Sequence, residues 1–171
     1  PTSNAPLYTS AASEVDKRQP SHAASIVCVT KKDSPLASAA GISQLTGTCT
    51  AQQATIWYES CLPQIPGAEI MPQSDDAPAM IMAVESGTVD FICTDMPTAR
   101  GACATYDDLV ILDFSGTDDN FVVPEGEINI GISVVKGNTQ LKEAFDAVLS
   151  QMTEDDCTAL MDEAISIQPK V

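Results

Sequence analysis

Between residues 48 and 114, short apolar runs alternate with segments of helical character, and this alternation limits the fold more than any other feature. We expect strands at 48–52, 68–71, 89–93 and 108–114, with helices at 56–62, 74–86 and 96–105 between them. Parallel strands need long crossover connections, usually helical, whereas antiparallel neighbours can be joined by a tight turn. The alternation therefore predicts a mostly parallel α/β sheet flanked by helices.

The stretch 74–99 places an acidic residue at the edge of that sheet. Ser74 is the expected N-cap of its helix, and Gly87 is the expected left-handed residue after the helix. Apolar residues at helical spacing mark the buried face: Ala77, Met80, Ile81 and Val84. Asp95 follows the next strand at its carboxyl end, where open α/β sheets bind ligands.

The charge balance and the missing motifs exclude several classes of function. The 171 residues include 8 Lys and Arg against 24 Asp and Glu, and the net charge of −16 repels nucleic acids and anionic membranes. The chain has one histidine, His22, and no Cys-x-x-Cys pair, so we expect no metal site. Hydrolase elbows and glycine-rich phosphate loops are missing as well. We therefore expect a protein that is not an enzyme and needs no cofactor.

Six cysteines leave the disulfide pattern open. Cys49 would begin a strand and Cys61 would end the helix that returns beside it, so these two residues are the candidate disulfide. The alternative is that both are buried free thiols. Cys28 and Cys93 lie in apolar strand patterns and are expected to be small core residues.

Three residues are suited to bind a small zwitterion. Thr55 stands at the head of a helix after a strand, where its hydroxyl and free backbone N–H groups suit a carboxylate. Arg18 can clamp the same carboxylate, and Asp95 suits an ammonium. Each also has a purely structural interpretation: Thr55 and Asp95 as helix N-caps, and Arg18 as a surface charge.

From residue 14 on, the chain resembles the type 2 periplasmic solute-binding proteins, in particular the family 3 polar amino acid binding proteins of ABC transporters. The segments that carry the resemblance occur in family order at residues 13–19, 25–35, 42–55, 82–99 and 130–141. The most specific is 82–99, which is similar to the family segment "ALxSGxVDxxxxDxxxA".

The resemblance assigns the ligand-binding residues. It implies that Arg18 holds the ligand carboxylate, that Gln52, Ala54 and Thr55 form the ligand loop, and that Asp95 takes the ammonium. Ala54 stands where the family usually has glycine, so the backbone is expected to approach the ligand less closely.

The resemblance also implies the domain organisation. The expected fold is periplasmic-binding-protein-like type 2, with the second lobe complete and the first lobe partial. Residues 1–24 are expected to form a loose N-terminal segment and a remnant of the first lobe, residues 25–135 the second lobe with the two hinge strands, and residues 136–171 the C-terminal helices of the first lobe. Those helices are expected to expose an apolar face and to mediate self-association, unless the chain is a fragment of a longer protein.

The implied function is the substrate-binding component of an ABC importer, in truncated form, with a free amino acid as ligand and a membrane permease as partner. The implied location is extracellular, periplasmic or lipid-anchored at the outer face of the cell membrane. Two alternatives remain: an enzyme of the cyclohexadienyl dehydratase type, with Asp95 and Glu59 as candidate acids, and the ligand-sensing domain of a receptor.

Overall fold

The computed structural model describes residues 8–10, 25–124, 133–135 and 137–167 of the chain. The chain divides into two compact units, one formed by residues 1–23 with 129–163 and the other by residues 24–128 with 164–171. Arg18 and His22 lie outside the described residues.

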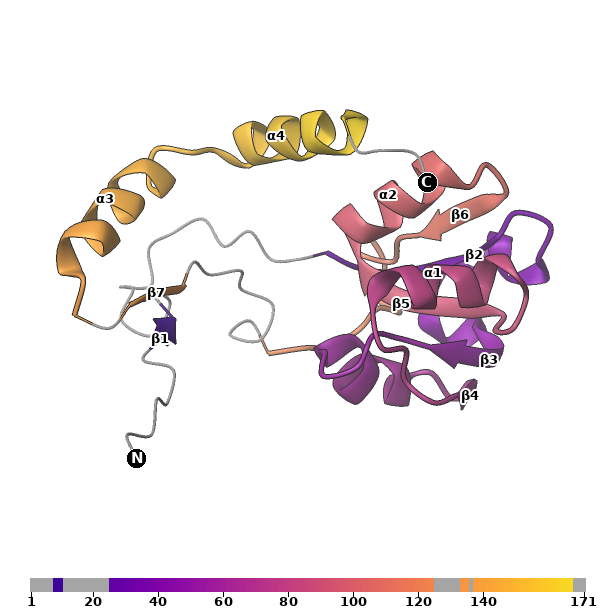
Figure 1. Ribbon diagram of the computed structural model, residues 1–171. Coiled ribbons are helices and arrows are strands. Elements are labelled where there is room, and N and C mark those ends of the chain that lie inside the picture. Colours follow the sequence, from indigo (N-terminus) through magenta and orange to yellow (C-terminus); the bar gives the residue numbers. More distant parts are fainter. Residues whose placement is uncertain (1–7, 11–24, 125–132, 136, 168–171) are drawn as a thin grey trace. The chain divides into compact units, whose positions relative to one another are not determined.

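The larger unit is built on a five-stranded sheet with the order β4-β3-β5-β2-β6 (Figure 1). The strands are β2 (Ile26–Lys31), β3 (Thr46–Thr50), β4 (Gly67–Ile70), β5 (Phe91–Asp95) and β6 (Leu109–Leu112). β3 pairs in parallel with β4 and β5, whereas β2 pairs antiparallel with β5 and β6. Four of the five strands therefore share one direction, as predicted. The sheet is mixed because β2, which precedes the strand–helix repeats, runs the other way.

The crossover connections are the helical segments that the sequence predicts. α1 (Ala77–Glu85) joins β4 to β5, and α2 (Met96–Thr105) joins β5 to β6. The expected helix at 56–62 is instead a π-helical turn, η4 (Trp57–Cys61), followed by a 3-10 turn, η5 (Leu62–Gln64). Two further 3-10 turns, η2 (Pro35–Ser38) and η3 (Ile42–Gln44), lie between β2 and β3.

The N-cap of α1 is Asp76 and not Ser74. The Asp76 carboxylate accepts a hydrogen bond from the Ala79 N–H at 2.8 Å, as an N-cap does. Ser74 forms a parallel β-bridge with Gln52, a long-range contact that takes it out of the helix. At the other end, Gly87 has φ of 74°, the left-handed conformation expected for it.

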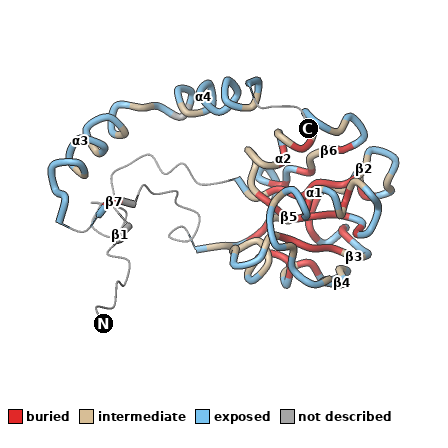
Figure 2. Tube along the Cα trace, in the orientation of Figure 1, coloured by how far each residue is buried: buried red, intermediate tan, exposed pale blue. Residues whose placement is uncertain are grey.

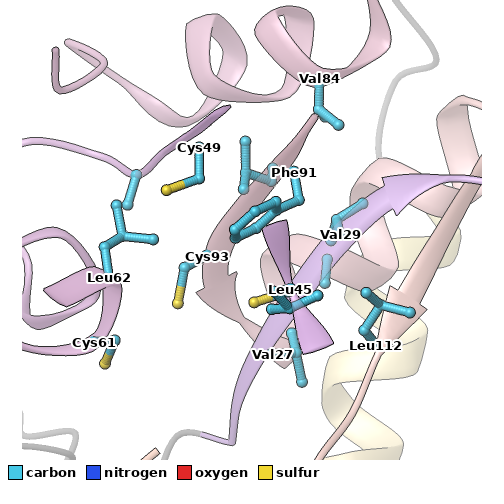
Figure 3. Packing of buried hydrophobic residues seen from close by; sticks show 14 of the residues in the cluster. Val27, Val29, Leu45, Cys49, Cys61, Leu62, Val84, Phe91, Cys93 and Leu112 are labelled. Carbon is cyan, nitrogen blue, oxygen red and sulfur yellow. The ribbon is translucent and has the colours of Figure 1, made fainter. Parts of the chain in front are cut away.

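The core lies between the sheet and its helices. Figure 2 shows the buried residues concentrated on the strands of the larger unit. Met80 and Val84 of α1 are fully buried, and Ala77 and Ile81 pack against the core, which confirms the predicted face of the helix. Figure 3 shows Cys49, Cys61 and Cys93 among the packed side chains of this core.

The smaller unit contains a two-stranded sheet, one whole helix and most of a second. β1 (Tyr8–Ser10) pairs antiparallel with β7 (Ser133–Val135), and the helices are α3 (Thr139–Leu149) and α4 (Glu154–Ser166). Asn138 caps α3, and its side chain accepts from the Leu141 N–H at 3.1 Å. The apolar face of α3 is exposed, with Leu141 at 41%, Phe145 at 37% and Val148 at 61%.

Candidate functional site

The candidate site lies at the end of the larger unit's sheet where the parallel strands β3 and β5 finish, which we call the carboxyl edge of the sheet. These strands are parallel, and Thr50 of β3 is paired with Ile92 of β5. The residues that follow β3 therefore come to the same edge as Asp95, the last residue of β5. This edge is the carboxyl side of the parallel strands, the side at which open α/β sheets bind ligands.

The loop after β3 is held by backbone hydrogen bonds to the chain that precedes α1. The Gln53 N–H donates to the Ser74 carbonyl at 2.8 Å, and the Ser74 N–H donates to the Ala51 carbonyl at 3.0 Å. Ala51 is fully buried, whereas Gln53 and Ala54 are exposed. The loop is thus anchored at its first residue and presents its tip to solvent.

Thr55 closes the loop. Its hydroxyl donates to the Gln52 carbonyl at 2.6 Å and accepts from the Tyr58 N–H at 3.4 Å. Ala54 lies between them with φ of 56°, a left-handed conformation that favours glycine. The Thr55 hydroxyl therefore has a structural role between the loop and the turn that follows it, and a role in ligand binding would be additional to it.

Asp95 begins the next helix. Its Oδ1 accepts a hydrogen bond from the Thr98 N–H at 2.7 Å, so Asp95 is the N-cap of α2. The residue is half-buried and pairs with Ile26 across the sheet. Among the described residues, its hydrogen bonds involve Oδ1 and leave Oδ2 without a donor. One carboxylate oxygen therefore serves the fold and the other is available at the edge.

The other predicted site residues fall outside this group. Arg18 lies outside the described residues, so the structure does not place it. Glu59 is exposed on η4. Cys49 and Cys61 are both buried in the core, and the structure has no disulfide between them, so their pairing stays a prediction.

Two features of the site were not predicted from the sequence. The first is the β-bridge between Gln52 and Ser74, because the local sequence around neither residue predicts it. The second is the indole N–H of Trp57, a buried donor without an acceptor among the described residues. Unsatisfied buried donors are uncommon in folded proteins, and this one lies just after the loop.

Among the described residues, no group of three or more His, Cys, Asp or Glu side chains is arranged to hold a metal ion. Within the same part of the chain, no helix has the length and apolar character needed to cross a membrane.

Comparison with known proteins gives matches at the level of structure. No protein-family model and no curated protein matches the sequence. A mutant of arginine-bound ArgBP from T. maritima matches with 25% identity and a TM-score of 0.56, over 76% of this chain and 56% of that one. AbpA from Streptococcus pneumoniae, an amino acid ABC transporter substrate-binding protein bound to L-arginine, matches with 20% identity and a TM-score of 0.64, over 90% and 65%.

A third match is the ancestral amino acid-binding protein AncCDT-1, a precursor of cyclohexadienyl dehydratase, with 21% identity and a TM-score of 0.60. It covers 82% of this chain and 57% of the matched one. The chain thus spans less than two thirds of the length of each of these proteins. Over that part, the chain has the type 2 periplasmic-binding-protein fold of the amino acid ABC transporter substrate-binding proteins.

Proposed function

We propose that the chain is part of the substrate-binding component of an amino acid importer and that it binds a free amino acid at the carboxyl edge of β3 and β5. The observation that supports the proposal is that β3 and β5 are parallel neighbours, so the loop 52–55 and Asp95 lie at the same end of the sheet. The two ends of an amino acid backbone differ in charge, and a site for it needs an anion-binding and a cation-binding part.

Asp95 supplies the cation-binding part. Its Oδ2 accepts the ligand ammonium while Oδ1 keeps the cap of α2. A charge-assisted hydrogen bond of this kind contributes about 1.5–3 kcal/mol, or roughly one to two orders of magnitude in affinity.

The loop supplies the anion-binding part. Among the described residues, the Ala54 N–H donates no hydrogen bond, and the loop tip is exposed, so this donor is free for a carboxylate oxygen. Gln52 and Thr55 hold the loop in shape through their contact at 2.6 Å. Arg18 would clamp the other carboxylate oxygen from the chain segment before β2.

L-arginine is the first ligand to test, because ArgBP and AbpA are arginine-bound proteins. In the whole protein, the binding component would lie outside the cell and deliver the amino acid to a membrane permease. Self-association through the exposed face of α3 remains part of the same proposal.

The test is an NMR titration of the chain with L-arginine and a panel of other amino acids, which detects millimolar dissociation constants. We expect amide shifts at residues 52–55 and 95–98, and Asp95→Asn should weaken binding at least about tenfold. Asparagine caps helices as well as aspartate, so this variant removes the charge and keeps α2.

Asp76→Asn is the matched control, since Asp76 caps α1 in the same way and lies outside the proposed site. It should leave the dissociation constant unchanged. The proposal fails if no amino acid shifts these amides, or if both variants bind as the wild type does.

An enzymatic function is the second candidate, favoured by the match to a dehydratase precursor. Glu59, exposed on η4, would then have to act as an acid together with Asp95. Turnover of a cyclohexadienyl acid that is lost in Glu59→Gln would support this function over transport.

A further inference from the structure

Four of the six cysteines are packed together in the core of the larger unit. Each of them is fully buried: Cys28, Cys49, Cys61 and Cys93. They come from β2, β3, η4 and β5, so the fold collects them from segments that are distant in the sequence. Figure 3 shows three of them, Cys49, Cys61 and Cys93, beside Leu62 and Phe91.

Cys28 and Cys93 are direct partners in the antiparallel pair of β2 and β5. The Met96 N–H donates to the Ser25 carbonyl at 3.0 Å, which marks the rung of Ser25 and Met96 as a hydrogen-bonded pair. Hydrogen-bonded and non-hydrogen-bonded pairs alternate along an antiparallel ladder. The pair of Cys28 and Cys93 is the third along the ladder from the pair of Ser25 and Met96. It is therefore a non-hydrogen-bonded pair.

The geometry of such a pair suits a covalent bond. In non-hydrogen-bonded pairs the Cα atoms lie about 4.5 Å apart and the side chains approach each other closely. Disulfides span Cα separations of about 4.4–6.8 Å, so the backbone at Cys28 and Cys93 needs no rearrangement to carry one.

The thiol of Cys93 also contacts its neighbours. Burial raises the pKa of Cys93 well above its usual range, and hydrogen bonds with the thiols of Cys28 and Cys61 raise it further. Cys61 belongs to the π-helical turn, where no strand register fixes the separation of its Cα from that of Cys93. The register thus favours Cys28 as the covalent partner.

We propose that Cys28 and Cys93 form a cross-strand disulfide that joins β2 to β5 when the protein folds under oxidising conditions. A thiolate of one cysteine attacks a disulfide oxidant, such as oxidised glutathione, and forms a mixed disulfide. The thiolate of the other attacks the first sulfur and releases a thiol. Two electrons pass to the oxidant, which leaves as two thiols carrying the two protons.

The bond must form while the core is still open. In the folded state both sulfurs are buried, and a protonated thiol is a poor nucleophile. Folding in the presence of an oxidant is therefore the condition under which the bond is expected, and mature protein should keep it. The bond would fix the strand that ends in Asp95 to the strand that begins the larger unit.

Peptide mapping of the 171-residue chain tests the pairing. The protein is refolded with oxidised and reduced glutathione, alkylated in guanidinium and digested with trypsin and Glu-C without reduction. Cleavage after Lys and Arg and after Glu separates the four cysteines into peptides 19–31, 33–59, 60–69 and 86–100. We expect 19–31 joined to 86–100, and peptides 33–59 and 60–69 alkylated.

Thermal unfolding with and without reductant gives a second readout. The bond closes a long loop, so the oxidised wild type should unfold more than about 10 °C above the reduced protein. Cys93→Ser should lose this difference. Cys49→Ser, at an equally buried cysteine outside the pair, should keep it.

Three results would overturn the proposal. One is the recovery of all four peptides alkylated after oxidative refolding. Another is Cys93 joined to peptide 60–69, and the third is Cys28 joined to peptide 33–59 or to peptide 60–69. The map of the wild type decides among these even if a serine variant does not fold.

Discussion

Replacing Ala54 with glycine should stabilise the larger unit. Among the described residues, Ala54 is the one non-glycine residue with a positive φ, at 56°. The left-handed conformation costs an L-residue about 1–2 kcal/mol, and glycine adopts it freely. Glycine also gives the unfolded chain more freedom, which offsets about 0.4–1 kcal/mol of the gain.

The methyl group of Ala54 contributes little to the balance, because the residue is exposed and removing the group leaves no cavity. The net stabilisation is therefore about 0.5–1 kcal/mol. For a unit of this size that corresponds to a rise of about 2–8 °C in Tm.

Urea unfolding followed by tryptophan fluorescence measures this change. Trp57 is the one tryptophan of the sequence and lies in η4, directly after the loop, so its signal reports on the larger unit. Ala104→Gly is the control, because Ala104 is exposed within α2 and the same substitution there should destabilise by about 1 kcal/mol. A midpoint that falls in both variants would refute the strain argument.

Three further predictions follow from contacts and burial. Gly47→Ala should destabilise the protein by about 2 kcal/mol or more in the same urea assay, because Gly47 has φ of 95° and a Cβ would lie 2.5 Å from Oδ2 of Asp90. Burial raises the pKa of Cys49 to about 12, so its thiol should resist iodoacetamide in the folded protein at pH 8; labelling as fast as in guanidinium would contradict this. Hydrogen bonds from the Thr153 backbone, and then from its hydroxyl, lower the pKa of Asp156 below 3.8, so this carboxylate stabilises α4 above that pH and the contribution is lost as pH falls through the lowered pKa. Thr153→Val should raise the carboxyl pKa part of the way back in an NMR titration, and an unchanged value would show that the hydroxyl has no effect.

Local signals in the sequence predicted some elements closely. The bounds of α2, 96–105, agree with the structure because Asp95 is a strong N-cap and Pro97 suits the first turn. β5 begins two residues later than predicted. Val89 is apolar and buried, yet it belongs to the turn after α1, where its N–H donates to the Ala83 carbonyl. Hydrophobicity reports burial and does not distinguish a turn from a strand.

Long-range contacts account for most of what the sequence could not predict. Ser74 and Asp76 are both residue types that favour the N-cap. Asp76 is the N-cap of α1 because Ser74 forms the β-bridge with Gln52. The π-helical turn ends with the Leu62 N–H donating to the Trp57 carbonyl, just before Pro63, which has no N–H to continue a helix. Neither the bridge nor the wider turn has a local signature.

The candidate site was predictable to the extent that strand ends are predictable. Asp95 and Thr55 follow β5 and β3, and the parallel pairing of those strands fixes their common edge. The pairing of Cys28 with Cys93 depends on a register between segments far apart in the chain. An apolar pattern shows that both residues are buried but not that they face each other.

The place of β2 in the sheet has a consequence for synthesis. Both of its partners, β5 and β6, lie after it in the chain, and β3 and β4 form no pair with it. A nascent chain therefore carries an apolar strand with four consecutive buried positions, Val27–Thr30, which has no neighbour until Asp95 has been made and lacks its second neighbour until Leu112 has been made. Such a segment is prone to aggregate before its partner strands are made. The larger unit should consequently fold in one late step after β6 emerges, and a chaperone that shields residues 26–31 until then would raise its yield.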